Sequence, residues 1–344
     1  MTGLKGYVWA IQLVFLFGAA SLCRGQADPA AELIQSGHWK RARTLVEARL
    51  HQAPNDAAAH FYLSQIRNAF GDHSSPLPLA EKAVELDPRV AKYHRQIAEV
   101  LGVMAQNSNA LQQLLLARRF RKEIDTALAL DPRDVQALRD LTEFYLLAPG
   151  IAGGSREKAG ATAESISAIG AAEGCLAKAR VAEFEKRPTD AEAWLKRAAE
   201  AQPPSYRAQT ALAHFYLAPE HSKLELAERA AQRALALDRG RAEAYALLAE
   251  IYAAQSRWNE LDALLADSAR NVPDDLVAYY RAALRINSAG EDLARAERYL
   301  NIYLAQEPEG NEPTIAEAQR ALSRVGQKSG SPAAQRRAGE RMLQ

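Results

Sequence analysis

Apolar and small residues recur along the chain with the spacing of amphipathic helices, and several of these runs end in the same way. Three segments, Ala80–Pro88, Ile124–Pro132 and Ala231–Arg239, each carry an apolar stripe that closes on Leu-Asp followed by proline or arginine. Proline cannot continue a helix, and it pushes the preceding residue out of the α region. Each segment is therefore expected to be a helix that ends at its Leu-Asp pair.

Most of the helix stops are separated by 34 to 36 residues. They fall at Pro54, Pro88, Pro132, Pro203, Arg239, Pro273 and Pro308. The successive gaps are 34, 44, 71, 36, 34 and 35 residues. We expect the gap of 44 to hold one repeat with an extended hairpin, and the gap of 71 to hold two repeats. A period of about 34 residues is typical of stacked helix–turn–helix units.

Each unit also contains an earlier helix, which lies before the helix that ends at the stop. Leu141–Pro149 and Leu212–Pro219 are close copies in which a leucine, a small residue and an aromatic residue follow the i, i+4 stripe of a helix. A Gly or Ser followed by an aromatic ring marks the turn between the two helices, at Gly37–Trp39, Gly71–His73 and Ser256–Trp258. This pattern predicts that each unit consists of two antiparallel helices, which pack closely at the small residue.

Together these positions resemble the tetratricopeptide repeat family, from residue 28 to about residue 326. The resemblance implies an all-α, right-handed superhelix of about eight helix–turn–helix repeats followed by a capping helix. The expected units are 28–56, 57–90, 91–134, 135–171, 172–205, 206–241, 242–275 and 276–310, with a cap at 311–326 and a flexible tail at 327–344. Two positions depart from the pattern: Pro76 stands where a second helix usually has alanine, and Arg239 replaces a stop proline.

Residues 1–27 have the composition of an export signal. Lys5 precedes the apolar stretch Val8–Leu22, and the segment contains no acidic residue. An apolar run of about 15 residues is short for a bilayer-spanning helix, which needs roughly 20. We expect a cleaved signal and a periplasmic or secreted protein. The alternatives are an uncleaved N-terminal anchor and lipid modification of Cys23, although Leu22 stands where a lipid-modification motif has a small residue.

Charge and motif content narrow the function. Because Lys5 and Arg24 are the basic residues of the signal, residues 28–344 keep 41 basic and 42 acidic side chains. This balance argues against a nucleic-acid binder, whose surface carries a basic excess. The sequence lacks Cys-x-x-Cys, His-Glu-x-x-His and Gly-x-Ser-x-Gly, and Cys175 is the only cysteine after the signal. We therefore expect no catalytic, cofactor or metal site, and no enzyme.

The resemblance implies that the first helix of each repeat lines a concave surface that binds a protein or peptide. The partner-binding residues expected on it are Lys92, Arg95, Glu99, Arg139, Glu143, Arg180, Arg207, His214 and Glu250, with Phe61, Gln65, Asn68, Phe184 and Tyr280 on or beside it. Arginine forks suit the carboxylates and carbonyls of an extended peptide. The expected function is an exported, non-catalytic scaffold or adaptor. The alternative is an accessory subunit of a larger envelope or enzyme assembly, attached to the membrane only through its N-terminus.

A glycine-rich loop, Pro149–Lys158, is the most distinctive insertion. Glycines before a helix can cradle phosphate, but the spacing does not match a phosphate-binding loop. The favoured interpretation is an extended hairpin turn in which Ser155 caps the next helix.

Overall fold

The computed structural model describes residues 28–72, 74–310 and 313–330. Within these ranges the regular structure is helical: seventeen α-helices and one short 3-10 helix, η1 (Gly150–Ala152). The predicted signal and residues 331–344 of the predicted tail lie outside the described residues. The all-α helix–turn–helix architecture predicted from the repeats is confirmed.

The helices alternate between two roles, and a pair lies in each of the eight predicted units. The first helices of the pairs are α1 (Pro29–Gln35), α3 (Ala57–Ala69), α5 (Ala91–Gln106), α7 (Val135–Leu147), α9 (Ala171–Phe184), α11 (Tyr206–Leu217), α13 (Ala242–Ala254) and α15 (Val277–Ala289). The second helices are α2 (Trp39–Gln52), α4 (Pro76–Leu86), α6 (Ala110–Leu130), α8 (Arg156–Ser167), α10 (Pro188–Glu200), α12 (Leu224–Leu237), α14 (Trp258–Asn271) and α16 (Leu293–Leu304). The last helix, α17 (Ile315–Ser329), runs three residues past the predicted end of the cap at 326.

Side-chain caps fix where many helices begin. Asp56 accepts from the N–H of Ala59, and Thr314 forms a reciprocal capping box with Glu317 at the start of α17. These bonds satisfy backbone donors that the first helical turn leaves unpaired. Pro76, which departs from the repeat pattern, is the first residue of α4. Proline is favourable there because its missing N–H would have no helical partner, so Pro76 starts the helix without weakening it.

The hairpin turns share one backbone conformation. A left-handed residue, with φ between +48° and +85°, stands between the two helices of six repeats: Gly37, Gly71, Lys186, Ser222, Ser256 and Gly290. The turns predicted at Gly37, Gly71 and Ser256 are thereby confirmed. Glycine adopts this conformation without strain, whereas a residue with a Cβ adopts it at a cost.

The small residues predicted to pack between helices lie in the core. Ser64, Thr142, Ala213 and Ala249 are at most 2% exposed, and Ala98 on α5 is equally buried. Their small volume lets neighbouring helices approach closely. Three consecutive clusters of buried apolar residues run along the array, and Val84 packs against both the first and the second.

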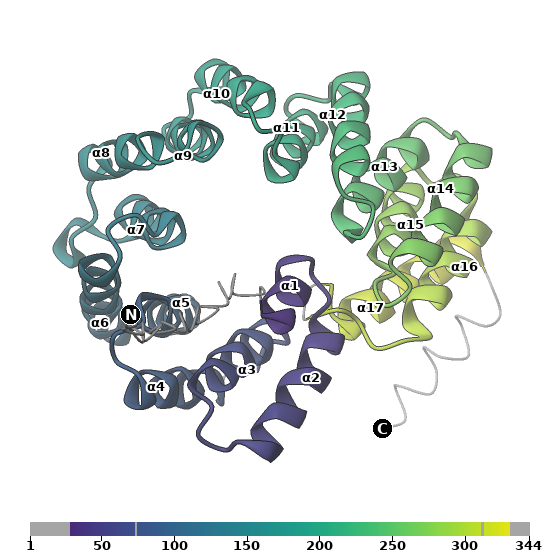
Figure 1. Cartoon of the computed structure of the whole chain (residues 1–344). Coiled ribbons are helices and arrows are strands. Elements are labelled where there is room, and N and C mark those ends of the chain that lie inside the picture. The colour runs from purple at the N-terminus through teal and green to yellow at the C-terminus, as the bar shows by residue number, and fades with distance from the viewer. Residues whose placement is uncertain (1–27, 73, 311–312, 331–344) are drawn as a thin grey trace, which may run out of the picture.

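The array curves into a closed ring (Figure 1). The odd-numbered helices lie on the inside of the ring and the even-numbered helices on the outside. The start of α2 contacts the C-terminal repeats: the backbone N–H of Lys40 donates to the Glu309 carboxylate at 2.8 Å, and Arg43 pairs with Glu307 at 3.1 Å. The repeat pattern predicts curvature, but it does not predict that the two ends of the array meet.

Candidate functional site

Polar pairs connect successive first helices along the inside of the ring. Arg180 on α9 donates two hydrogen bonds, of 2.6 and 2.9 Å, to the carboxylate of Glu143 on α7. The equivalent pairs are Glu99–Asn68, Arg95–Asp140, Arg207–Glu173, His214–Glu243 and Arg281–Glu250. We call this series the inner ladder. It crosses each junction from α3 to α15, so the inner surface carries a row of polar pairs, most of them between charged side chains.

Eight of the nine predicted partner-binding residues belong to the inner ladder or lie beside it: Arg95, Glu99, Arg139, Glu143, Arg180, Arg207, His214 and Glu250. The ninth, Lys92, lies with its ammonium 5.0 and 5.2 Å from the ring centres of Phe61 and Tyr62. Burial lowers the pKa of Lys92. The structure therefore places all nine residues on first helices, but many of them already interact with other side chains of the same chain.

Arg95 is the least available of the nine. It is 8% exposed and lies 3.4 Å from Glu99, 3.7 Å from Asp134 and 3.9 Å from Asp140. These carboxylates share one buried cation. Burial, with the neighbouring Glu99, raises the pKa of Asp140 to about 7. Arg95 therefore connects two repeats, and its guanidinium group is not available to bind a partner.

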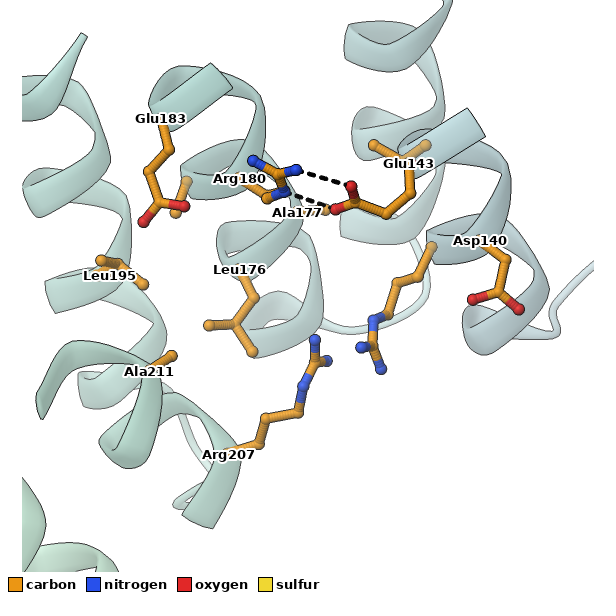
Figure 2. Close-up of a pocket in the computed structure, with 12 residues that line it drawn as sticks. Asp140, Glu143, Leu176, Ala177, Arg180, Glu183, Leu195, Arg207 and Ala211 are labelled. Carbon is orange, nitrogen blue, oxygen red and sulfur yellow. Dashed lines mark hydrogen bonds and ion pairs between the residues drawn. The ribbon is translucent and has the colours of Figure 1, made fainter. Parts of the chain in front are cut away.

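Four of the predicted residues surround one pocket. Arg139, Glu143, Arg180 and Arg207 line a cavity of about 220 Å³ between α7, α9, α10 and α11 (Figure 2). Leu176, Leu195 and Ala211 supply its apolar wall. Figure 2 shows Arg180 turned to Glu143, with Arg207 on the opposite side of Leu176. The pocket thus combines apolar surface with three guanidinium groups and with the carboxyl groups of Asp140, Glu143 and Glu183 on the inner face of the ring.

Arg139 and Arg207 make this pocket electrostatically distinct. Arg139 donates to the neutral side-chain oxygen of Gln136 at 2.8 Å, and Arg207 pairs with Glu173. Burial, and then the like charge of Arg207, lower the pKa of Arg139. Two guanidinium groups that repel each other inside a partly desolvated pocket would be stabilised by an incoming carboxylate.

A second, larger cavity lies where the ring closes. Its volume is about 780 Å³, and it is bounded by the α1–α2 turn and by α13, α15 and α17. Trp39, Tyr280, Leu284 and Tyr303 give it apolar walls, and Arg281 supplies a cation. Of these, Tyr280 was predicted from the sequence to lie beside the concave surface. Trp39 could not be predicted to lie here, because it faces the residues of the last repeat only after the ends of the array meet.

The glycine-rich loop has a structural role. Gly153 is left-handed, and a Cβ at Gly154 would lie 1.8 Å from the carbonyl oxygen of Ala148. Ser155 accepts from the N–H of Lys158, and its own N–H donates to the carbonyl of Tyr145 at 2.8 Å. The predicted extended turn with Ser155 as helix cap is confirmed.

One protein-family model and several solved structures are similar to this chain. Residues 221–267 match the family described as the E motif. Yeast Tom70 is similar in structure, with a TM-score of 0.56 at 15% identity over 92% of this chain and 68% of that chain. A tetratricopeptide repeat protein from Thermus thermophilus, TTC0263, aligns with a TM-score of 0.49 at 20% identity over 55% of this chain and 96% of its own. No curated protein sequence matches significantly.

The chain is therefore an all-α repeat solenoid with the fold of tetratricopeptide repeat proteins. That class of fold is the one the repeat motifs predicted. None of the helices in the described part of the chain combines the length and the apolar character needed to cross a bilayer.

Proposed function

We propose that this protein is a non-catalytic scaffold that binds a segment of another polypeptide on the inside of its ring. The fold supports a protein-interaction role, because stacked repeats present an extended concave surface. The observation that carries the finer proposal is the pocket around Arg139 and Arg207. It lies on that surface and pairs two guanidinium groups with apolar walls.

The chemistry of this pocket selects a carboxylate. A guanidinium donates two parallel hydrogen bonds to a carboxylate, and such bonds are strongest where water is partly excluded. A guest carboxylate between Arg139 and Arg207 would offset the burial and the repulsion that lower the pKa of Arg139. An apolar guest side chain would then pack on Leu176 and Leu195. We propose an extended segment that carries an acidic side chain or ends in a free carboxylate.

We further propose that the scaffold acts outside the cytoplasm, in the periplasm or after secretion. The composition of residues 1–27 supports this, since a basic start and a short apolar run are typical of an export signal. Fractionation of cells that express the full chain, with N-terminal sequencing of the recovered protein, tests it. Recovery of the protein in the cytoplasm with Lys5 retained would contradict export.

Binding is tested with a library of fluorescent peptides screened against the untagged chain by fluorescence anisotropy. The selected peptide is then compared with two analogues, one amidated at its C-terminus and one with Asp and Glu replaced by Asn and Gln. At least one analogue should bind at least tenfold more weakly, because breaking a desolvated charged hydrogen bond typically costs about 2–5 kcal/mol. The analogue that loses affinity identifies which carboxylate is bound.

The matching variant is Arg139→Gln with Arg207→Gln, and its control is Arg229→Gln with Arg233→Gln. Both double variants remove two positive charges, but Arg229 and Arg233 are exposed on α12, on the outer side of the ring. The inner variant should bind the peptide at least tenfold more weakly, and the outer variant should match the wild type. Equal affinity in the wild type and the inner variant would refute the assignment of the pocket.

A further inference from the structure

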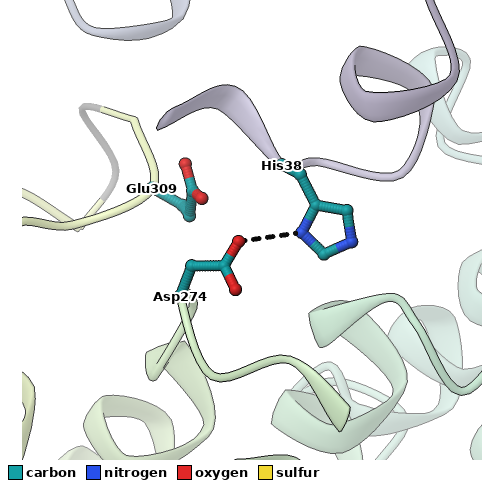
Figure 3. A group of neighbouring side chains, drawn as sticks. All are labelled: His38, Asp274 and Glu309. Carbon is teal, nitrogen blue, oxygen red and sulfur yellow. Dashed lines mark ion pairs between the residues drawn. The ribbon is translucent and has the colours of Figure 1, made fainter. Parts of the chain in front are cut away.

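Three potential metal ligands meet where the two ends of the array close the ring. His38 lies in the turn between α1 and α2, Asp274 lies between α14 and α15, and Glu309 follows α16 (Figure 3). One ligand atom from each lies within 4.8 Å of the other two. His38 Nδ1 is 3.3 Å from Asp274 Oδ2, and Figure 3 shows Glu309 on the other side of Asp274. All three side chains are partly buried.

Two carboxylate oxygens of this group are buried without a hydrogen-bond partner: Oδ2 of Asp274 and Oε1 of Glu309. The second oxygen of each carboxylate is held from outside the group. Asp274 Oδ1 accepts from the Arg41 guanidinium, and Glu309 Oε2 accepts from the backbone N–H of Lys40 at 2.8 Å. Each carboxylate is therefore oriented by one oxygen, while the other oxygen is buried without a hydrogen bond; beside Asp274 Oδ2 lies the His38 ring, 3.3 Å away. A buried unpaired acceptor is costly, so it indicates a missing partner.

We propose that His38, Asp274 and Glu309 bind a divalent transition-metal ion, and that this ion clasps the ring shut. The donor set is one imidazole nitrogen and two carboxylate oxygens, which zinc and its neighbours in the first transition series accept. Two such ligands, each ~2.0–2.1 Å from a tetrahedral ion, lie about 3.3 Å apart. That is the separation between His38 Nδ1 and Asp274 Oδ2. The Glu309 oxygen lies within 4.8 Å of the other two ligand atoms, so its side chain would have to move closer to complete a three-ligand site.

The local charge favours a cation. The carboxylates around the closure outnumber the fixed cations by four to three: Asp274, Asp275, Glu307 and Glu309 against Lys40, Arg41 and Arg43. The ammonium of Lys40 donates to the backbone carbonyls of Asp274 and Glu307, at 2.7 Å each, and not to the carboxylates of the trio. The bonds from Lys40 and Arg41 also act as the outer hydrogen bonds that orient metal ligands in proteins.

The position of the ligands gives the ion its role. One ligand comes from the first repeat, and two come from the last two repeats, so a bound ion would tie together segments that the repeat stacking leaves separate. Exposed ion pairs at the same closure weaken as salt rises. A coordinated metal ion would hold the ring when those pairs no longer do.

The proposal is tested by titrating the untagged, chelator-treated chain with Zn²⁺ in a calorimeter. We expect one saturable site per chain. His38→Ala and Glu309→Gln should each lower the affinity at least tenfold, since each removes one of three ligands. The matched controls are His51→Ala, an exposed histidine at the end of α2, and Glu307→Gln, a closure carboxylate outside the trio. Both controls should bind Zn²⁺ as the wild type does.

Small-angle X-ray scattering at high salt then tests the clasp. The wild type should become more extended when metal is removed, and Zn²⁺ should restore the compact ring. The same ion should not restore the His38→Ala variant, whose thermal unfolding is measured in parallel to show that it is folded. Absence of a saturable site, binding unaffected by both ligand variants, or a ring whose dimensions do not respond to Zn²⁺ would each overturn the proposal.

Discussion

The ammonium of Lys40 donates a 2.7 Å hydrogen bond to the backbone carbonyl of Asp274, although 234 positions separate the two residues in the sequence. This bond and its neighbours join the first repeat to the seventh and eighth. Their effect is to turn an open superhelix into a ring with a closed inner surface. A guest segment must then enter through a face of the ring, or the closure must open first.

Lys40 is expected to govern how readily the ring opens. Lys40→Met removes two hydrogen bonds from a charged donor, each worth roughly 1.5–3 kcal/mol, while keeping a long side chain. In small-angle scattering across a salt series, the variant should become extended at lower salt than the wild type. Lys122→Met, on the exposed face of α6, is the control and should follow the wild-type curve. Identical curves for all three proteins would show that Lys40 does not hold the closure.

Gly174 is expected to be irreplaceable at the contact between α8 and α9. A Cβ at this position would lie 2.3 Å from both Cα and Oγ of Ser167. Gly174→Ala should therefore force the helices apart and lower the free energy of unfolding by about 1–3 kcal/mol. A Cβ at Gly160, in α8, would meet nothing within 4 Å, so Gly160→Ala should stabilise by ~0.5–1 kcal/mol. Urea unfolding followed by circular dichroism measures both; a stable Gly174→Ala variant would contradict the packing argument.

The repeat units could be predicted because their determinants are local. The Leu-Asp stops, the small residues and the turn glycines each act within a few residues, so helix positions follow from the sequence. The wall of the pocket at Arg139 was partly predictable, since periodicity places that arginine on a first helix. The glutamates and aspartates that pair with the predicted residues, such as Glu173 and Glu243, were missed because each belongs to a neighbouring repeat.

The closure of the ring could not be predicted from local sequence patterns. Small rotations between successive repeats accumulate over eight units, and no single residue sets their sum. His38 was assigned from the sequence to a hairpin turn, where the structure also places it, but Asp274 and Glu309 come beside it only after the full turn of the superhelix. A search for metal ligands by sequence spacing therefore has nothing to find.

Lys186 occupies a turn position where the backbone favours glycine. Its φ is +57°, while Gly37, Gly71 and Gly290 hold the equivalent place in other repeats. Lys186→Gly should remove the left-handed strain and raise the free energy of unfolding by roughly 0.5–1 kcal/mol, despite the greater freedom of glycine in the unfolded chain. The reverse change, Gly71→Lys, should destabilise. Loss of stability in Lys186→Gly would show that the turn is not strained.

Asp140 is expected to make the stability of the inner ladder depend on pH. Burial, together with the Glu99 carboxylate, raises the pKa of Asp140 from 3.8 to about 7. Between these two values the folded chain holds a proton that the unfolded chain has released, so the contribution of this residue to stability falls as pH rises and is lowest above pH 7. Asp140→Asn removes this titration and keeps a side chain of the same size.

The stability of Asp140→Asn relative to the wild type should therefore increase as pH rises. Urea unfolding at pH 5 and at pH 8 measures the difference, and at pH 8 Asp140→Asn should be the more stable protein, by up to a few kcal/mol at ~1.4 kcal/mol per unit of pKa. Asp125→Asn, at an exposed site on α6, serves as the control and should leave the pH dependence unchanged. A difference between Asp140→Asn and the wild type that is the same at both pH values would mean that Asp140 is already ionised in the folded protein at pH 5, held so by Arg95.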